Sequence, residues 1–372
     1  MSHSLPCSSP DLAAAALALT LVLTTSLGTA FCGEAPGDSL EQEDFTQLTG
    51  FPIVFYTPET GLAAGAAGAY FFKQEAGQRP NTIGGILFFT TRSQIVFGLN
   101  SEIYSSDGSR RLGGSLGFQK FPTRFWGIGN DTTDDMEETY TPRTVEAGLL
   151  VQKRFLSYLM FGGTYSFWYE DVAEVKEGGL LGSGEIPGSE GGISSGLGFV
   201  ATWDTRDNIY YAKRGAYFDV GAVYHGSFLG SDYEYSLFAF DLRYFIPLYR
   251  ANALGLRGRL KASAGDTPFQ AMPRLGGALL LRGYPEGRYR DMASSSLQAE
   301  FRSDYWWRLA FAVFGSLGQV AERVGSLPDA PVRYTAGLGV RLRLNDENFN
   351  LRIDIGFGDN TSGFYLVAGE AF

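Results

Sequence analysis

The stretch NFNLRIDIGFG, residues 348–358, alternates apolar with polar or glycine residues along its whole length. Residues 332–344, VRYTAGLGVRLRL, repeat the alternation and place arginine at three positions of the polar face. A period of two is typical of a β-strand whose two faces meet different surroundings. These two stretches therefore predict long β-strands.

The same period continues through most of the chain after Phe51 and fits two architectures: a soluble sandwich with one wet face per sheet, or a membrane barrel with a polar lumen. The alternating segments run about nine to thirteen residues, near the roughly 9–11 of a tilted membrane-spanning strand and above the five or six usual in soluble strands. Arginine and glycine crowd the polar face, and aromatic residues gather at segment ends. We therefore predict an all-β fold, a transmembrane antiparallel β-barrel, closed because lipid leaves no partner for unpaired backbone groups.

About sixteen segments can be counted, an even number as expected for a single-chain bacterial barrel. The three longest connections, 121–142, 172–189 and 266–292, all follow odd-numbered segments, so they are expected on the outer side if the N-terminus is periplasmic. The predicted segments are 51–57, 61–74, 80–91, 94–106, 110–120, 143–153, 157–171, 190–204, 215–227, 232–248, 252–265, 293–305, 308–320, 331–344, 348–358 and 361–372.

The composition argues against several kinds of functional site. The 372 residues carry a formal charge of −10, which disfavours nucleic acid because phosphate binding needs a basic face. Two cysteines and two histidines leave almost no material for a disulfide framework or a metal centre. We expect no catalytic, cofactor-binding or metal site.

The N-terminal residues resemble an export signal. An apolar stretch at 12–28 ends in small residues, so we predict a signal peptide over 1–32, although no Lys or Arg precedes the stretch. A membrane anchor is the alternative. Residues 33–50 are polar and predict a short periplasmic lead-in before a barrel spanning 51–372.

A loop motif carries a family resemblance. The run LRGYPEGRYRD, residues 281–291, places three arginines beside aromatic residues, and it falls in the predicted sixth outer loop. It resembles the Arg-Gly-aromatic loop tip of BamA/TamA-type proteins, the bacterial surface antigen superfamily. Residues 56–61, 125–131, 203–207 and 369–372 match other stretches of that family.

The resemblance implies that the sixth loop folds back into the lumen, where Arg282 contacts Glu300 and the ring of Phe314. A guanidinium can pair with a carboxylate and stack on an aromatic face. The family usually has an aspartate where this chain has Ser316, so the loop is expected to be anchored more weakly or by Glu300 alone. An ordinary solvated outer loop is the alternative. The residues of this expected latch are Arg282, Gly283, Tyr284, Glu300, Phe314 and Ser316.

Phe372 is expected to act as a C-terminal assembly signal, since outer-membrane barrels resembling this one end in an aromatic strand. It shares the predicted lipid-facing phase with Phe364, Leu366 and Ala368, and Glu370 interrupts that face. A charge near the bilayer edge costs only about 0–1 kcal/mol, so Glu370 is compatible with the barrel.

The resemblance implies a protein of the Gram-negative outer membrane that assists protein assembly or transport without enzymatic chemistry. Its expected partners are outer-membrane lipid and lipopolysaccharide, with periplasmic proteins or unfolded barrels as further candidates. Only about 18 residues separate the predicted leader from Phe51, too few for a periplasmic POTRA repeat, so a barrel-only form is expected. A passive pore or structural surface barrel is the alternative.

A third hypothesis is a membrane-embedded hydrolase. It would need a nucleophile, a base and an orienting group within mutual reach. His225 is the single histidine after the leader, and its phase places it inside the barrel, away from lipid substrates. The acidic run at 131–138 is expected to be a solvated loop, with a divalent cation site as the alternative.

Overall fold

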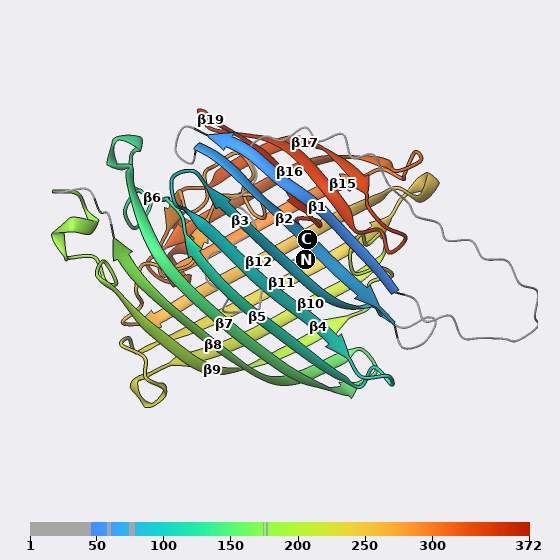
Figure 1. Ribbon diagram of the computed structural model, residues 1–372, viewed down its shortest axis with the longest axis horizontal. Helices are drawn as coiled ribbons and strands as arrows, with labels where there is room; N and C mark the ends of the chain where they lie inside the picture. Colours follow the sequence, from blue (N-terminus) through green and yellow to red (C-terminus); the bar gives the residue numbers. More distant parts are fainter. Residues whose placement is uncertain (1–45, 58–60, 74–78, 174, 176–177) are drawn as a thin grey trace, which may run out of the picture.

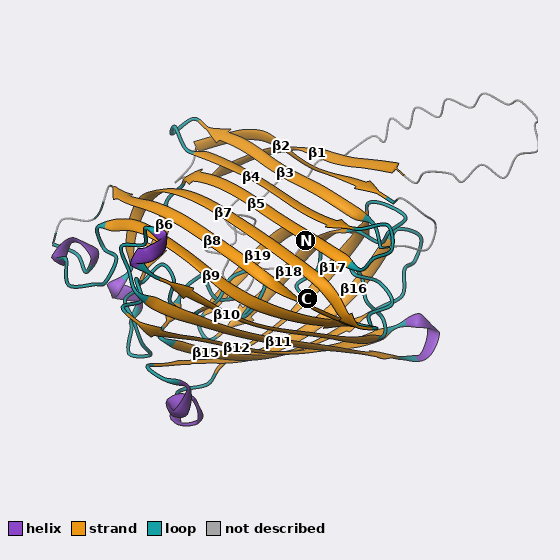
Figure 2. Cartoon of the chain, turned by 90° about the horizontal axis from the view of Figure 1, so that it is seen from below, coloured by secondary structure: helices purple, strands orange, loops and turns teal. Residues whose placement is uncertain are grey.

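The computed structural model describes residues 46–57, 61–73, 79–173, 175 and 178–372. The predicted leader and residues 33–45 of the predicted lead-in lie outside the described residues. In the described part, sixteen long strands wrap obliquely around one cylinder (Figures 1 and 2). They are β1 Thr46–Thr57, β2 Gly61–Phe72, β3 Asn81–Thr90, β4 Ile95–Tyr104, β5 Arg110–Lys120, β7 Glu138–Leu156, β8 Leu159–Ala173, β9 Gly191–Asp204, β10 Gly215–His225, β11 Tyr235–Pro247, β12 Ala253–Gly265, β15 Ala293–Arg302, β16 Leu309–Ala321, β17 Arg333–Arg343, β18 Asn350–Gly358 and β19 Thr361–Ala368.

The remaining elements are short and belong to the connections. The short strands are β6 Thr123–Phe125, β13 Arg274–Leu275 and β14 Tyr289–Arg290. The 3-10 helices are η1 Asp134–Met136, η2 Leu181–Ser183, η3 Ser227–Leu229, η4 Tyr249–Ala251 and η5 Val324–Asp329. Across the described residues, no helix has both the length and the apolar character needed to cross a membrane.

The sixteen predicted segments correspond one to one with the sixteen long strands, and the predicted all-β barrel is confirmed. Most ends differ from the prediction by one to three residues, and three differ by four or five. β7 begins at Glu138 instead of residue 143, because its first residues pair with β6. β1 begins at Thr46 instead of residue 51, because its first five residues pair with the end of β2, from Thr46 opposite Phe72 onward. β19 ends at Ala368 instead of residue 372, because Gly369 has a φ of 91° and turns the chain out of the sheet.

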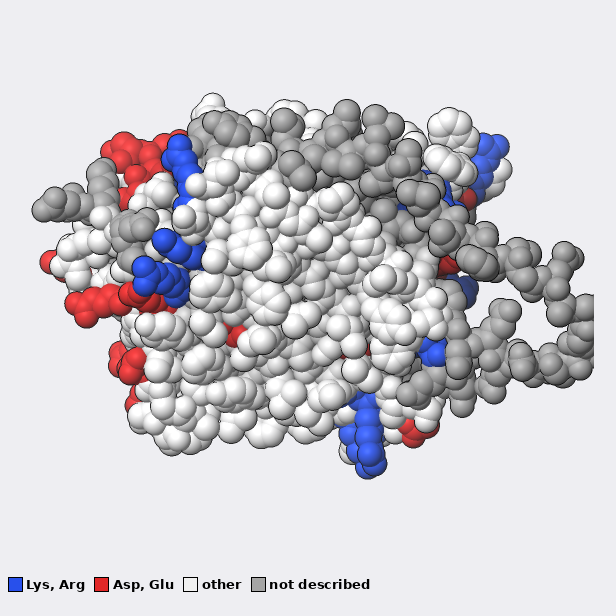
Figure 3. All heavy atoms as spheres, viewed as in Figure 1, with Lys and Arg blue, Asp and Glu red and all other residues white. Residues whose placement is uncertain are grey.

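The alternating pattern separates the two faces of the barrel wall. In β18, the side chains of Ile353, Ile355 and Phe357 are 36%, 45% and 56% exposed on the outside, whereas Arg352 and Asp354 are fully buried inside. On the face drawn in Figure 3, the described part of the outer wall is a broad band almost without charged side chains, and most charges lie toward its two ends. This distribution is that of a barrel surrounded by lipid.

The three longest connections all lie at one end of the cylinder. The connections 105–109, 157–158, 248–252 and 303–308 form one end, which we call the short-turn end. The connections 121–137, 174–190 and 266–292 leave the other end, the long-loop end. This asymmetry agrees with the predicted order of the connections and is usual in outer-membrane barrels.

The sheet has one seam, between its first and last strands. Within the described residues, antiparallel ladders join all neighbouring long strands from β1–β2 to β18–β19, and none joins β19 to β1. At the short-turn end, side chains at the end of β2 contact the turn before β18, so they join the strands on either side of the seam. The rings of Phe71 and Phe349 have centroids 5.4 Å apart, and Lys73 Nζ lies 2.5 Å from Glu347 Oε1. The seam is therefore held by side chains at this end.

Candidate functional site

The connection between β12 and β15 folds back into the barrel as a hairpin. β13 pairs with β14, Arg274 opposite Arg290 and Leu275 opposite Tyr289. Apolar residues of the hairpin pack against Val320 of β16 on the inner wall. They are Leu275, Leu280, Leu281, Tyr284 and Tyr289. The hairpin therefore carries residues 276–288 into the lumen as a packed plug.

Arg282 lies at the tip of this hairpin and is fully buried. Its Nη2 is 2.8 Å from Glu300 Oε2, and its Cζ is 3.4 Å from the centroid of the Phe314 ring. Glu300 and Phe314 are directly opposite each other in the β15–β16 ladder. The structure thus places the predicted arginine, acid and aromatic ring in contact.

A second carboxylate, absent from the predicted set, holds the other side of Arg282. Asp354 Oδ2 of β18 accepts a hydrogen bond from Arg282 Nη1 at 2.6 Å. Ser316, which we expected to weaken the anchor, instead donates from Oγ to the backbone oxygen of Leu280 at 3.3 Å. The expectation that Glu300 alone holds Arg282 is therefore wrong, because Asp354 on the inward phase of β18 supplies the second anion.

Further arginines join both carboxylates into a buried network. Arg341 of β17 reaches Asp354 Oδ1 at 2.6 Å, Glu300 Oε2 at 3.3 Å and Glu370 Oε2 at 2.7 Å. Arg302 pairs with Glu300 at 2.9 Å, and Arg352 pairs with Asp354 at 3.1 Å. Charges this deeply buried are stable only when they are paired, so the network and the loop tip depend on each other.

Gly283 and Tyr284 bring the tip against the last two strands. Gly283 has a φ of 131°, and a Cβ there would lie 2.8 Å from the backbone carbon of Phe357. Its N–H donates to the hydroxyl of Tyr365 at 2.9 Å, and the N–H of Asp359 donates to the hydroxyl of Tyr284 at 3.2 Å. Only glycine combines this backbone conformation with so close an approach.

The last four residues turn into the lumen, which corrects the prediction that Phe372 lies on the lipid-facing phase. Arg257 Nη1 donates to the backbone oxygen of Ala371 at 3.0 Å, and Arg302 Nη2 donates to that of Phe372 at 2.5 Å. The Phe372 ring is 3% exposed and stacks on Phe245 at 6.1 Å. Inward-facing arginines therefore hold the segment that was expected to complete the last strand.

Two other arginines of the hairpin hold the long loops. Arg288 donates from Nη1 to Thr132 Oγ1 at 2.9 Å and pairs with Asp134 at 3.0 Å. Arg290 Nη1 donates to the backbone oxygen of Phe269 at 3.1 Å, and burial lowers the pKa of its guanidinium to about 10. In the part of the chain that the structure describes, no group of three potential metal ligands occurs, so the acidic run forms no such cluster.

His225 lies on the inner wall, where its Nε2 is 2.9 Å from Ser166 Oγ. Its ring stacks on Tyr235 with centroids 4.3 Å apart. The imidazole is 1% exposed, and its buried Nδ1 has no hydrogen-bond partner among the described residues. A hydrolytic triad needs an orienting group on that nitrogen, so the pair is better explained as part of the packed wall.

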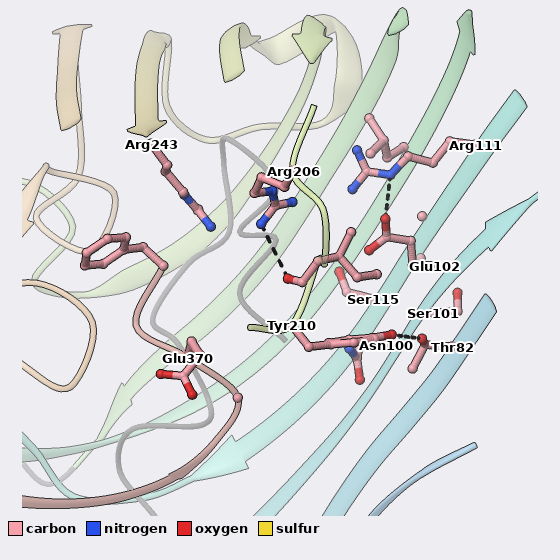
Figure 4. Close-up of a pocket in the computed structure, with 16 residues that line it drawn as sticks. Thr82, Asn100, Ser101, Glu102, Arg111, Ser115, Arg206, Tyr210, Arg243 and Glu370 are labelled. Atoms are coloured by element: carbon pink, nitrogen blue, oxygen red, sulfur yellow. Dashed lines mark hydrogen bonds and ion pairs between the residues drawn. The ribbon is translucent and has the colours of Figure 1, made fainter. Parts of the chain in front are cut away.

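Polar cavities occupy the lumen toward the short-turn end. The larger has a volume of about 560 Å³ and is bordered by Arg79, Arg154 and Asp204. The smaller, about 130 Å³, is bordered by Arg111 and Arg206, with Glu370 at its margin (Figure 4). The plug and the charged network thus fill one part of the lumen, and space remains beside them.

Comparison with known proteins identifies the family. The Omp85 superfamily domain matches residues 88–372. The chain belongs to the Omp85 superfamily. The resemblance found in the sequence is confirmed at this level, and this Omp85 barrel is a protein of the bacterial outer membrane. No curated protein matches the sequence.

Two solved structures share the fold of this Omp85 barrel. One is BamA from Haemophilus ducreyi lacking POTRA domains 1–3, with 14% identity and a TM-score of 0.53 over 88% of this chain and 69% of that one. The other is CdiB from Acinetobacter baumannii, with 13% identity and a TM-score of 0.53 over 88% of this chain and 60% of that one. The chain thus spans less than two thirds of the CdiB chain.

Proposed function

We propose that this Omp85 barrel assists the assembly or transport of proteins at the outer membrane and performs no enzymatic reaction. The seam carries this proposal. β1 offers twelve residues of strand edge and β19 offers eight, with no ladder between them in the described residues. An unpaired edge is a template for an incoming strand, which binds by adding itself to the sheet.

The contacts across the seam support an opening that costs little. Among the described residues, Phe71 contacts Phe349 and Lys73 pairs with Glu347, and Ala368 of β19 packs on the apolar cluster that Phe71 and Phe349 share. The two charged side chains are 17% and 16% exposed. A partly exposed ion pair contributes about 0–1 kcal/mol, and an aromatic pair adds about 0.5–1.5 kcal/mol beyond its buried area.

The contacts of Arg282 brace the part of the barrel wall next to this seam. Arg282 connects β15, β16 and β18 through Glu300, Phe314 and Asp354. In this proposal the latch preserves the curvature of the last strands while the β1 edge is used. We assign the short-turn end to the periplasm, from which an unfolded substrate would arrive. The described residues form the barrel strands and their connecting loops. Capture of a substrate would therefore need residues outside this part or a separate periplasmic protein.

The test is a folding assay in proteoliposomes. The variant Lys73→Cys/Glu347→Cys, with Cys7 and Cys32 replaced by serine, is joined by a short thiol cross-linker to tether the seam. The control Ala66→Cys/Leu87→Cys tethers β2 to β3, where these residues are already opposite each other. We expect the untethered barrel and the control to accelerate the folding of a second outer-membrane barrel, and the seam tether to abolish that acceleration.

A passive pore is the competing function, and the cavities at the short-turn end are the observation that favours it. A pore would conduct ions equally with the seam tethered and would leave the folding rate of the second barrel unchanged. Ion conductance without any acceleration of folding would therefore refute the assembly role.

A further inference from the structure

Seven residues on seven neighbouring strands form one straight row across the outer wall, which we call the outer row. Each lies directly opposite the next in an antiparallel ladder, and all stand on the outward phase of their strands. In order from β5 to β12 they are Arg110, Lys153, Phe161, Ala201, Val220, Phe240 and Leu260. The row therefore begins with two cations and continues with five apolar side chains.

The apolar part of the outer row lines a groove of about 440 Å³. Small residues, Ala201 and Ala222, form its floor, and the stacked rings of Phe161 and Phe199, 6.1 Å apart and 8° from parallel, form one side. Leu260 and Val324 of η5 also line the groove. The groove is thus a shallow, open apolar hollow in the outer wall.

The length of the groove matches one acyl chain. Its five row positions span four interstrand spacings, about 19 Å at about 4.8 Å each. One leaflet of a bilayer is about 15 Å deep, half of a hydrocarbon core of about 30 Å. A single acyl chain lying obliquely along the row would fill the groove from Phe161 toward Leu260.

The cationic end of the outer row has no anion of its own. Arg110 and Lys153 are directly opposite each other and exposed, and neither side chain forms an ion pair among the described residues. Like charges in this position repel each other. Asp107 of the neighbouring turn accepts hydrogen bonds from Ser105 Oγ at 2.5 Å and from the Ser109 N–H at 3.0 Å, and it forms no ion pair with either cation in the part of the chain that the structure describes. A phosphate between the two cations would relieve their repulsion.

We propose that the outer row binds one anionic phospholipid of the periplasmic leaflet. Its phosphate lies between Arg110 and Lys153, and one acyl chain lies in the groove. The pair stands at the short-turn end of β5 and β7, so the headgroup is at the membrane surface on that side. The two cations at one end select an anionic headgroup, and the apolar groove at the other end has the length of an acyl chain. This site lies on the outer wall and does not depend on the seam or the latch.

The test is native mass spectrometry of the full chain, released from bilayers of equimolar phosphatidylglycerol and phosphatidylcholine. We expect phosphatidylglycerol to be retained preferentially, and Arg110→Gln/Lys153→Gln to remove that preference, by about fivefold per cation and about 25-fold for the pair. The matched control Arg250→Gln/Arg308→Gln removes two exposed cations from other short turns and is expected to change nothing. Ala201→Phe should reduce retention of any phospholipid, whereas Ala147→Phe, outward on β7 outside the groove, should not.

Three results would overturn the proposal. The first is equal retention of the two phospholipids by the unaltered chain. The second is an equal loss in the control pair, which would show a general surface effect. The third is preferential retention of lipid A when it is added to the mixture, which would assign the groove to the outer leaflet. Heat-induced unfolding of each variant, read by gel mobility, confirms that the compared proteins are folded.

Discussion

Neutralising Asp354 is expected to destabilise the buried charge network that holds the loop tip. Its carboxylate accepts hydrogen bonds from Arg282 at 2.6 Å, from Arg341 at 2.6 Å and from Arg352 at 3.1 Å, and its side chain is fully buried. Asp354→Asn preserves the shape of the side chain and removes its charge. The predicted result is a barrel that unfolds at a lower temperature in detergent.

The magnitude follows from the balance of charges in the network. Four guanidinium groups, those of Arg282, Arg302, Arg341 and Arg352, face three carboxylates, and the substitution leaves two. Removing one partner of a buried ion pair costs about 3–5 kcal/mol. Because Arg282 and Arg341 also contact Glu300, we expect the lower value, about 3 kcal/mol, which lowers the unfolding midpoint by about 6 °C at roughly 2 °C per kcal/mol.

The assay is heat-induced unfolding in detergent micelles, read from the change in gel mobility between folded and unfolded barrel. Asp346→Asn, which removes an exposed carboxylate from the turn before β18, is the matched control and should leave the midpoint in place. An unchanged midpoint for Asp354→Asn, or an equal fall in the control, would refute the view that this network holds the loop.

The remaining predictions concern the loop tip and the topology. Arg282→Ala leaves three cations facing three carboxylates, so its midpoint should fall, but by less than that of Asp354→Asn in the same assay. Gly283→Ala should cost about 1–3 kcal/mol because its Cβ would meet the β18 backbone at a φ of 131°, whereas Gly325→Ala, with open space around it, should be neutral. Trypsin added outside intact cells should cut after Arg124, whose side chain is 53% exposed, and spare the short turns; cleavage confined to the short turns would invert the topology.

The fold was predictable because a barrel in lipid imposes one rule on every strand. Outward residues meet hydrocarbon and inward residues meet a polar lumen, so alternation, together with segment length and turn residues, located the sixteen long strands. The same alternation put Glu300 and Phe314 on the inner wall, and the family resemblance supplied Arg282 as their partner.

The remaining details depend on contacts between distant parts of the chain. Asp354 and Arg341 stand on the polar phase of the two stretches that reveal the fold, yet nothing local indicates which inward side chain the loop tip will meet. The inward turn after Ala368 has a similar origin. Glu370, which interrupts an apolar face in the sequence, pairs with Arg341 at 2.7 Å, so a charge that seemed misplaced in lipid belongs to the lumen.

Arg341 binds two parts of the protein at once. Its Nη1 and Nη2 donate to Asp354 and Glu300, the carboxylates that also bind Arg282 of the hairpin, and its Nε donates to Glu370 in the segment after the last strand. Displacement of the hairpin by a ligand at the cell surface would remove Arg282 from Glu300 and Asp354, and these carboxylates would then compete with Glu370 for Arg341. Binding of a ligand at the cell surface would in this way change the contacts of the C-terminal segment inside the barrel.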